Sequence, residues 1–299
     1  MYGKREIVAM SVINYIDNHR LDVQFILNWL LKKDLRAEMS RNKDLKNKHK
    51  GKRCFIIGNG PSLIHHDLTK LTDEYVFTVN YIMKSNYFET LNSNYHILVS
   101  PIIFELDPQN VDDLDKIKSI SKTVDTNPDM TYIIPYRRKS AFNKLFPNIK
   151  PYTIFNNKIY APFLKKPDDI HRNIPVFQNV VLYAINTAIY MGFDEIYLLG
   201  VDMTGFLEHF EYHKINDHWG HSYKKTQEEK EKNIQTLIEK NIDNEFYLKT
   251  YGKTLEQFKL IKQHALSKNV KLINASAHGA LDVLERGDYE RIFLKNVSN

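Results

Sequence analysis

The sequence predicts an α/β fold with a mostly parallel sheet flanked by helices. The apolar run at residues 54–57 ends on a glycine-containing turn, as a buried first strand does. Strand and helix patterns alternate after this turn, which is typical of a parallel sheet. A helix pattern at residues 179–191 is closed by Gly192 and followed by an apolar strand at residues 195–202.

The turn after the first strand has the sequence Gly58-Asn59-Gly60-Pro61-Ser62. The two glycines permit close backbone approach and positive φ, and Pro61 suits the first position of a helix. Free N–H groups and the Ser62 hydroxyl at such a helix start favour an anion. The third glycine of the dinucleotide fingerprint is absent, so we expect a Rossmann-like nucleotide turn that does not take NAD. The alternative is a turn whose glycines serve packing alone.

The first half of the chain alternates between strands and other elements. We expect a helix at residues 63–71, a strand at 75–79 that ends at Asn80, and a strand at 95–99 that ends at Ser100. Residues 107–151 give mixed signals, with a short strand at 131–134, and are interpreted as a variable insertion. Residues 157–175 contain three prolines and are interpreted as a loop over the sheet.

The second half supplies the other side of the crevice. Asp202 follows a buried strand and should face the same crevice as Asn59, because ligands of open parallel sheets bind at the carboxyl ends of strands. Residues 203–223 are polar and aromatic and are interpreted as a mobile lid. We expect helices at 224–240 and 255–266, a last strand at 270–273 and a final helix within 281–294.

Composition indicates a soluble protein of 299 residues with 42% apolar and 26% charged residues. We expect a helical basic extension at residues 1–50 and one domain at residues 51–299. There is no apolar run long enough to span a membrane and no signal-peptide block. The single Cys54 lies within a predicted strand, where it is a core residue rather than a nucleophile. A cytoplasmic location follows.

The net charge of +6 is concentrated in one segment. Residues 32–53 hold ten Lys or Arg against three acidic residues, directly after an apolar helical stretch at 23–31. Such a segment suits the inner face of an anionic membrane, and a solvated charged face is the alternative. The rest of the chain has no recognised nucleic-acid motif, so no nucleic acid is expected.

The lid carries four histidines, which raises the question of a metal. His209 and His213 are four residues apart but lack the His-Glu-x-x-His order of a zinc site. The pair Asp113-Leu114-Asp115 lies in a Lys-rich segment typical of a helix surface. We therefore expect no metal, and acid–base chemistry by one histidine.

Several of these segments together resemble glycosyltransferase family 42, the metal-independent bacterial sialyltransferases that use CMP-sialic acid. The similarity runs through Ile56-Ile57-Gly58-Asn59-Gly60-Pro61-Ser62-Leu63, Asn80, the helix-to-strand passage at 191–198, Gly200-Val201-Asp202 and Gly220-His221-Ser222. It covers about residues 53–225. It implies a GT-A-like variant of the Rossmann-like fold and an inverting transfer from a CMP-sugar to a glycan, in lipooligosaccharide or capsule biosynthesis.

The resemblance also implies roles for individual residues. His221 would be the general base, while Thr204 or Tyr212 would steady the leaving phosphate. The donor would be held by the set Gly58, Asn59, Gly60, Ser62, Asn80, Ser100, Asn179 and Asp202. The family has asparagine where Ser100 stands and a serine near Asn179, so another CMP-activated acidic sugar stays open as the donor.

The chain also resembles a broader Rossmann-like group that includes hydroxymethylpterin pyrophosphokinase-like proteins. That resemblance implies an alternative, an ATP-dependent pyrophosphokinase with magnesium on Asp202. A non-catalytic nucleotide-binding module is a third. The partners expected are the CMP-sugar and a glycan or lipooligosaccharide acceptor, and both peripheral membrane contact and a homo-oligomer stay open.

Overall fold

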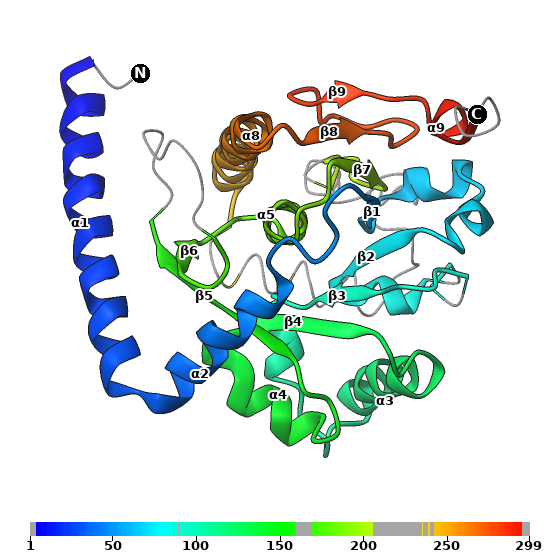
Figure 1. Cartoon of the computed structure of the whole chain (residues 1–299), viewed down its shortest axis with the longest axis horizontal. Helices are drawn as coiled ribbons and strands as arrows, with labels where there is room; N and C mark the ends of the chain where they lie inside the picture. The colour runs from blue at the N-terminus through cyan, green and yellow to red at the C-terminus, as the bar shows by residue number, and fades with distance from the viewer. Residues whose placement is uncertain are drawn as a thin grey trace.

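The computed structural model describes residues 4–85, 87–88, 90–159, 169–205, 235, 239 and 242–294. Its centre is a nine-stranded sheet in the order β6-β5-β4-β3-β2-β1-β7-β8-β9 (Figure 1). Every described pair of neighbouring strands is parallel. The predicted α/β, Rossmann-like fold is confirmed.

The central strands are apolar because both faces of the sheet are covered. The strands are β1 Arg53–Ile57, β2 Tyr75–Val79, β3 Tyr95–Ile97, β4 Thr131–Pro135, β5 Tyr152–Lys158, β6 Asn173–Pro175, β7 Glu195–Leu199, β8 Lys271–Asn274 and β9 Glu285–Arg286. In β1, Cys54 and Ile56 belong to one core cluster while Phe55 and Ile57 belong to the other. Burial raises the pKa of the Cys54 thiol well above its usual range, which agrees with a core residue.

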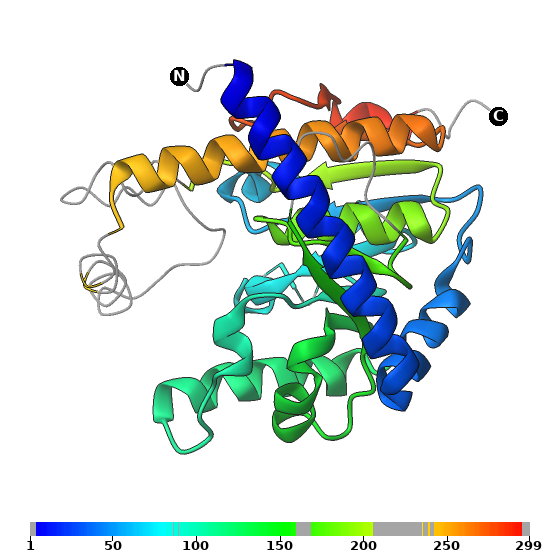
Figure 2. The same ribbon diagram turned by 90° about the vertical axis from the view of Figure 1, so that its left-hand side faces the viewer.

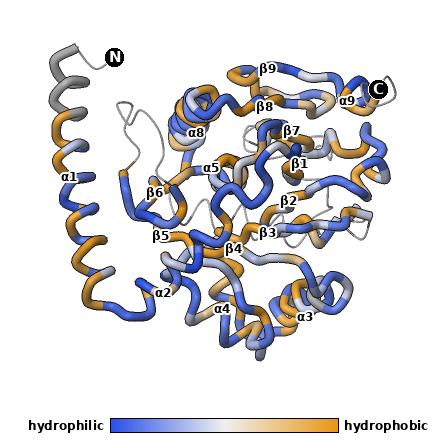
Figure 3. Tube along the Cα trace, viewed as in Figure 1, coloured by the Kyte–Doolittle hydropathy of each residue, from blue (hydrophilic) through white to orange (hydrophobic). Residues whose placement is uncertain are grey.

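Helices cover the two faces of the sheet. The helices are α1 Lys4–Leu31, α2 Lys33–Arg41, α3 Val111–Thr126, α4 Lys139–Leu145, α5 Val180–Tyr190, α8 Asn244–Ser267 and α9 Tyr289–Leu294. Residues of α5 and α8 join the cluster of Cys54 and Ile56, whereas residues of α3, α4 and α9 join that of Phe55. Figure 3 shows the hydrophobic strands between these two layers.

Helix α5 crosses from one half of the sheet to the other. Asn179 caps it, because its side chain accepts a 2.8 Å hydrogen bond from the N–H of Val181. The chain turns away at Gly192, which has φ of +81°. A Cβ at Gly192 would lie 3.0 Å from the Cα of Asn47, so both the turn and the packing require glycine.

Four sequence predictions about local structure are wrong. Residues 63–71 do not form one helix but parts of two 3₁₀ helices, Pro61–His65 and Leu68–Leu71, separated where Asp67 caps the second. Residues 107–151 are no insertion, because α3, β4 and α4 complete the layers. Residues 157–175 are not only a loop, because they contain the last residues of β5 and the whole of β6. The strand predicted at 270–273 is not the last one, because β9 follows it. Most of residues 224–240 lie outside the described part of the chain.

The N-terminal helices dock on the β5 side of the sheet (Figures 1 and 2). The Asn18 amide donates to the carbonyl of Ile159 at 2.8 Å and accepts from its N–H at 2.7 Å. Phe25 packs against Phe155 with ring centroids 5.0 Å apart. Among the described residues, no helix has the length and apolarity that crossing a membrane requires.

Candidate functional site at the β1–β7 junction

The strand order reverses at β1. From β1 the chain adds β2 to β6 on one side and then returns to place β7 on the other. In open α/β sheets this reversal opens a crevice at the carboxyl ends of the two central strands, where ligands bind. The predicted glycine turn follows β1 and the turn at residues 200–204 follows β7, so both lie at this point.

The two turns are joined by backbone hydrogen bonds. The N–H of Gly58 donates to Leu199 at 2.8 Å and that of Gly60 donates to Gly200 at 2.7 Å. A Cβ on Gly60 would lie 2.5 Å from Cγ of Asp202 and 2.6 Å from the carbonyl oxygen of Gly200. Neither Gly58 nor Gly60 has positive φ, and Gly200 does, at +62°. Glycine is therefore needed in the turn after β1 because the two turns pack too closely to leave room for a Cβ.

Asp202 holds the turn after β1 in place. Its Oδ2 accepts a 2.8 Å hydrogen bond from the N–H of Ser62, and its Oδ1 accepts from the Ser62 hydroxyl. The side chain is 2% exposed, and burial raises the pKa of its carboxyl against the opposing effect of the Ser62 hydrogen bonds. The prediction that Asp202 shares a crevice with the glycine turn agrees with this geometry.

Asn59 is the residue of this turn that lacks an internal partner. Its Oδ1 is buried and accepts no hydrogen bond within the part of the chain that the structure describes. A buried acceptor without a donor costs free energy, so such groups in native proteins call for an explanation such as a ligand. A hydroxyl or amino group of a nucleotide would satisfy it.

Asn80 and Ser100 lie at the same edge of the sheet. Asn80 has φ of +44°, and its Oδ1 accepts hydrogen bonds from the N–H groups of Val99 at 3.1 Å and Ser100 at 3.3 Å. This amide therefore ties the end of β2 to the end of β3. Donor contact by either residue stays a prediction.

Asn179 reaches the crevice from the start of α5. Its Nδ2 donates to Sδ of Met203 at 3.5 Å, and Met203 follows Asp202 with φ of +55°. Positive φ is uncommon for a residue with a side chain and marks a locally constrained backbone. Thr204 is 9% exposed beside it. His221 and Tyr212 lie outside the described residues, as do His209, His213 and His218, so the base and the lid stay predictions.

The turn after β8 belongs to the same site and was not predicted from the sequence. The Ser276 hydroxyl accepts a 3.0 Å hydrogen bond from the N–H of Val201, and the N–H of Ala280 donates to the carbonyl of Asp202 at 2.6 Å. His278 lies against His65, with ring centroids 5.3 Å apart. The signal was present in the sequence, because Asn274-Ala275-Ser276 follows an apolar strand as Asp202 does.

The described residues contain no group of three His, Cys, Asp or Glu side chains placed to hold a metal. Asp202 is the carboxylate nearest the turn, and Ser62 engages both of its oxygens. Magnesium sites use one or two carboxylates together with substrate phosphates. The described donor set therefore offers magnesium a poor fit.

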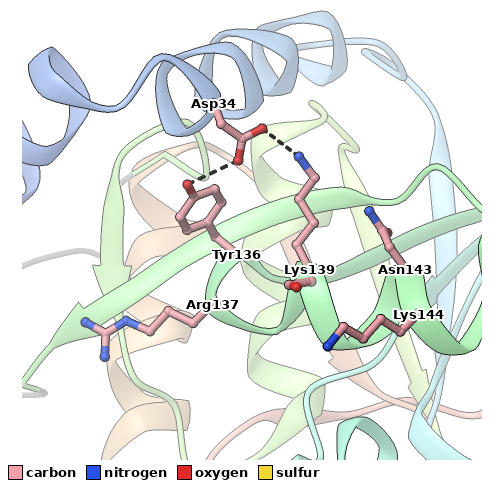
Figure 4. A pocket seen from close by; sticks show the side chains of 7 residues that line it. Asp34, Tyr136, Arg137, Lys139, Asn143 and Lys144 are labelled. Carbon is pink, nitrogen blue, oxygen red and sulfur yellow. Dashed lines mark hydrogen bonds and ion pairs between the residues drawn. The ribbon is translucent and has the colours of Figure 1, made fainter.

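A second hollow lies away from this crevice, between α2 and α4 (Figure 4). It measures about 510 Å³, and Asp34 accepts hydrogen bonds there from Lys139 at 2.8 Å and from Tyr136 at 3.2 Å. Lys139 also pairs with Glu38 at 2.9 Å. Its amine is thus bound by the protein's own carboxylates.

A family model described as 6-hydroxymethylpterin diphosphokinase MptE-like matches residues 32–205. The match covers more than half of the 299 residues and includes the turns after β1 and β7. The chain belongs to this MptE-like family. The predicted resemblance to the hydroxymethylpterin pyrophosphokinase-like group is confirmed. The match excludes α1 and ends before His221.

Two solved structures of the sialyltransferase CstII from Campylobacter jejuni are similar to the MptE-like chain. The complex with the substrate analogue CMP-3FNeuAc is 16% identical with a TM-score of 0.44, over 79% of this chain and 86% of that chain. The complex with cytidine-5'-monophosphate is 16% identical with a TM-score of 0.41, over 80% and 88%. Similarity this low carries no argument about activity. A comparison with curated proteins found no match.

Proposed function

We propose that this MptE-like protein is a metal-independent, inverting glycosyltransferase. It moves sialic acid, or a related CMP-activated acidic sugar, to a hydroxyl of a cell-surface glycan such as a lipooligosaccharide or capsule chain. The proposal rests on the buried Oδ1 of Asn59, which accepts no hydrogen bond from any described residue. Asn59 lies in the turn after β1, whose backbone is hydrogen-bonded to the chain at the end of β7. The choice of a CMP-sugar rests on the sequence resemblance described above.

In the proposed reaction, the acceptor oxygen attacks the anomeric carbon as the bond from that carbon to the phosphate oxygen breaks. CMP leaves with the electron pair, and the acceptor's proton passes to His221. Asn59 contacts the nucleotide, because the N–H groups of Gly58, Gly60 and Ser62 and the Ser62 hydroxyl already donate within the protein. Thr204 and Tyr212 donate to the leaving phosphate. Without a metal, such donors must carry the developing charge.

The family description favours a second candidate, an ATP-dependent pyrophosphokinase that holds magnesium on Asp202. The burial and the hydrogen bonds of the Asp202 carboxylate argue against this candidate. Asp202 is 2% exposed and accepts hydrogen bonds from Ser62 through both oxygens. To ligate magnesium it would have to release contacts that hold the turn after β1.

A transfer assay with CMP-sialic acid tests the proposal. We expect turnover to persist in EDTA, and His221→Ala to lower kcat by about 10²–10⁴ while CMP affinity is unchanged, because the base contacts the acceptor and not the nucleotide. Alanine at His209, His213 or His218 provides the matched controls. Sialyl transfer that disappears in EDTA and returns with magnesium would overturn the metal independence, whereas diphosphate transfer from ATP in place of sialyl transfer would support the pyrophosphokinase.

A further inference from the structure

A hollow of about 230 Å³ lies where the end of α1 meets α2 and the chain that leads into β6. Its apolar lining comes from Phe25, Ile26 and Trp29 of α1 and from Met39 of α2. Phe25 and Met39 belong to a small core cluster that joins the N-terminal helices to β5, and Trp29 packs against this cluster. The folded protein therefore provides the hollow with an apolar floor.

The polar side of this hollow is cationic. It is lined by Lys43, His171 and Arg172. The carboxylate of Asp169 lies 3.8 Å from Nζ of Lys46 and 3.9 Å from Nδ1 of His171. Burial lowers the pKa of the His171 imidazole, so the positive charge comes from the other two side chains. Neither Lys43 nor Arg172 has a carboxylate partner among the described residues, which leaves both cations available to an anion.

The apolar lining continues onto the outer surface of α1. Ile26 lines the hollow and is 52% exposed. Val23 and Leu30 lie three positions before it and four positions after it, on the same side of the helix, and are 46% and 54% exposed. A ligand that filled the hollow alone would leave these side chains in water, so the partner extends beyond the hollow.

The chain next to this apolar surface is basic. Figure 3 shows the hydrophobic end of α1 followed by the hydrophilic start of α2. Lys32 and Lys33 are exposed there, and within the described ranges neither pairs with a carboxylate. The Arg36 guanidinium lies 6.0 Å from the ring centroid of Trp29, at the edge of the hollow. An anionic bilayer offers phosphates to such cations and acyl chains to the apolar side chains, whereas a soluble anion offers charge alone.

We propose that the hollow binds an anionic phospholipid and thereby docks the protein on the surface of an anionic bilayer. The lipid phosphate contacts Lys43 and Arg172, and the adjoining apolar part of the lipid lies against Trp29. Pockets for drug-sized ligands measure about 300–1,000 Å³, so a hollow of 230 Å³ takes only part of one lipid. The remainder stays in the bilayer, against Ile26 and Leu30. The site at the β1–β7 junction takes no part in this binding.

Co-sedimentation of the full chain with phosphatidylcholine vesicles, with and without phosphatidylglycerol, tests the charge requirement. We expect binding only when phosphatidylglycerol is present, and weaker binding as salt rises. Lys43→Glu/Arg172→Glu should lower the affinity by about tenfold or more, because both phosphate contacts are lost. Lys253→Glu/Lys259→Glu makes the same charge change at exposed positions of α8 and should bind as the wild type does. Circular dichroism checks that each variant is folded.

Trp29 reports directly on contact with lipid. The chain has two tryptophans, so Trp29 is the only one left in Trp219→Phe. We expect its emission to shift to shorter wavelength on vesicles and to be quenched by brominated acyl chains. Ile26→Asp should weaken vesicle binding, because a charge replaces an apolar contact with the bilayer. Leu248→Asp is the matched control, because Leu248 is 51% exposed on α8.

Three results would overturn the proposal. They are a wild type that does not distinguish the two kinds of vesicle, a folded Lys43→Glu/Arg172→Glu variant with wild-type affinity, and bound protein whose Trp29 emission brominated lipid leaves unchanged. Glycerol phosphate at matched ionic strength separates a lipid from a soluble phosphate. Release of the protein from the vesicles by glycerol phosphate would assign the two cations to a soluble ligand instead.

Discussion

Two aspartates of this chain lie at junctions between distant segments, in opposite surroundings. Asp202 joins the turns after β1, β7 and β8, is 2% exposed, and has its carboxyl pKa raised by burial. The Asp34 side chain joins α2 to α4, is 62% exposed, and has its pKa lowered, chiefly by its hydrogen bond to Lys139. Burial fixes the position of the Asp202 side chain, whereas the Asp34 side chain remains solvated. A ligand at the β1–β7 junction therefore meets groups that the protein has already oriented.

The largest expected effect concerns the close approach of the two turns. Gly60→Ala would bring a Cβ to 2.5 Å from Cγ of Asp202 and 2.6 Å from a backbone oxygen, so unfolding should become easier by about 3 kcal/mol. Gly252→Ala is the matched control, because nothing lies within 4 Å of its Cβ position in α8. It should stabilise the protein by about 1 kcal/mol through helix propensity. Urea unfolding measures both, and equal effects would contradict the packing role of Gly60.

The pH dependence of folding stability should distinguish the two aspartates, with a smaller effect than that of Gly60→Ala. The pKa of Asp202 is raised in the folded state, so its protonation favours folding: stability relative to Asp202→Asn should increase as the pH falls through the folded pKa toward about 3.9. The pKa of Asp34 is lowered, so its contribution is present above about 3.9 and is lost as the pH falls through the folded pKa. Because Asp34 is exposed, we expect less than about 1 kcal/mol from it. Denaturant unfolding of both Asn variants from neutral to acid pH should give opposite slopes, and parallel slopes would refute the contrast.

The sequence was sufficient to predict the elements that are buried on both sides. The apolar runs of β1, β2 and β7 and the capped helix α5 have the composition of core elements, and the structure has them within a residue or a few of the expected bounds. The elements toward the edge of the sheet were harder to predict from the sequence. Strand β6 has only three residues, and α3 is a mainly polar surface helix. Tertiary packing determines where such elements form, and the local sequence pattern does not reveal that packing.

The candidate site was predictable to a similar degree. Two strands that each end on a glycine and a polar residue indicated that Asn59 and Asp202 share a crevice. The sequence did not indicate that Asp202 is bound by Ser62, or that Gly60 faces Asp202 more closely than a Cβ allows. Those facts depend on distances between turns 140 residues apart. Ser276 and His278 were missed although the strand before them was predicted, because their contacts with Val201 and His65 depend on how the turns pack against one another.

Calorimetric titration of CMP in the presence of EDTA decides which nucleotide the β1–β7 junction binds and whether a metal is needed. We expect CMP to bind without a divalent cation, and Asn59→Ala to weaken this binding by about tenfold because the buried acceptor is removed. We also expect no binding of ATP under the same conditions or with magnesium added. The contrary result, in which CMP produces no heat while ATP with magnesium binds the wild type, would show that the β1–β7 junction serves a different nucleotide and a different reaction.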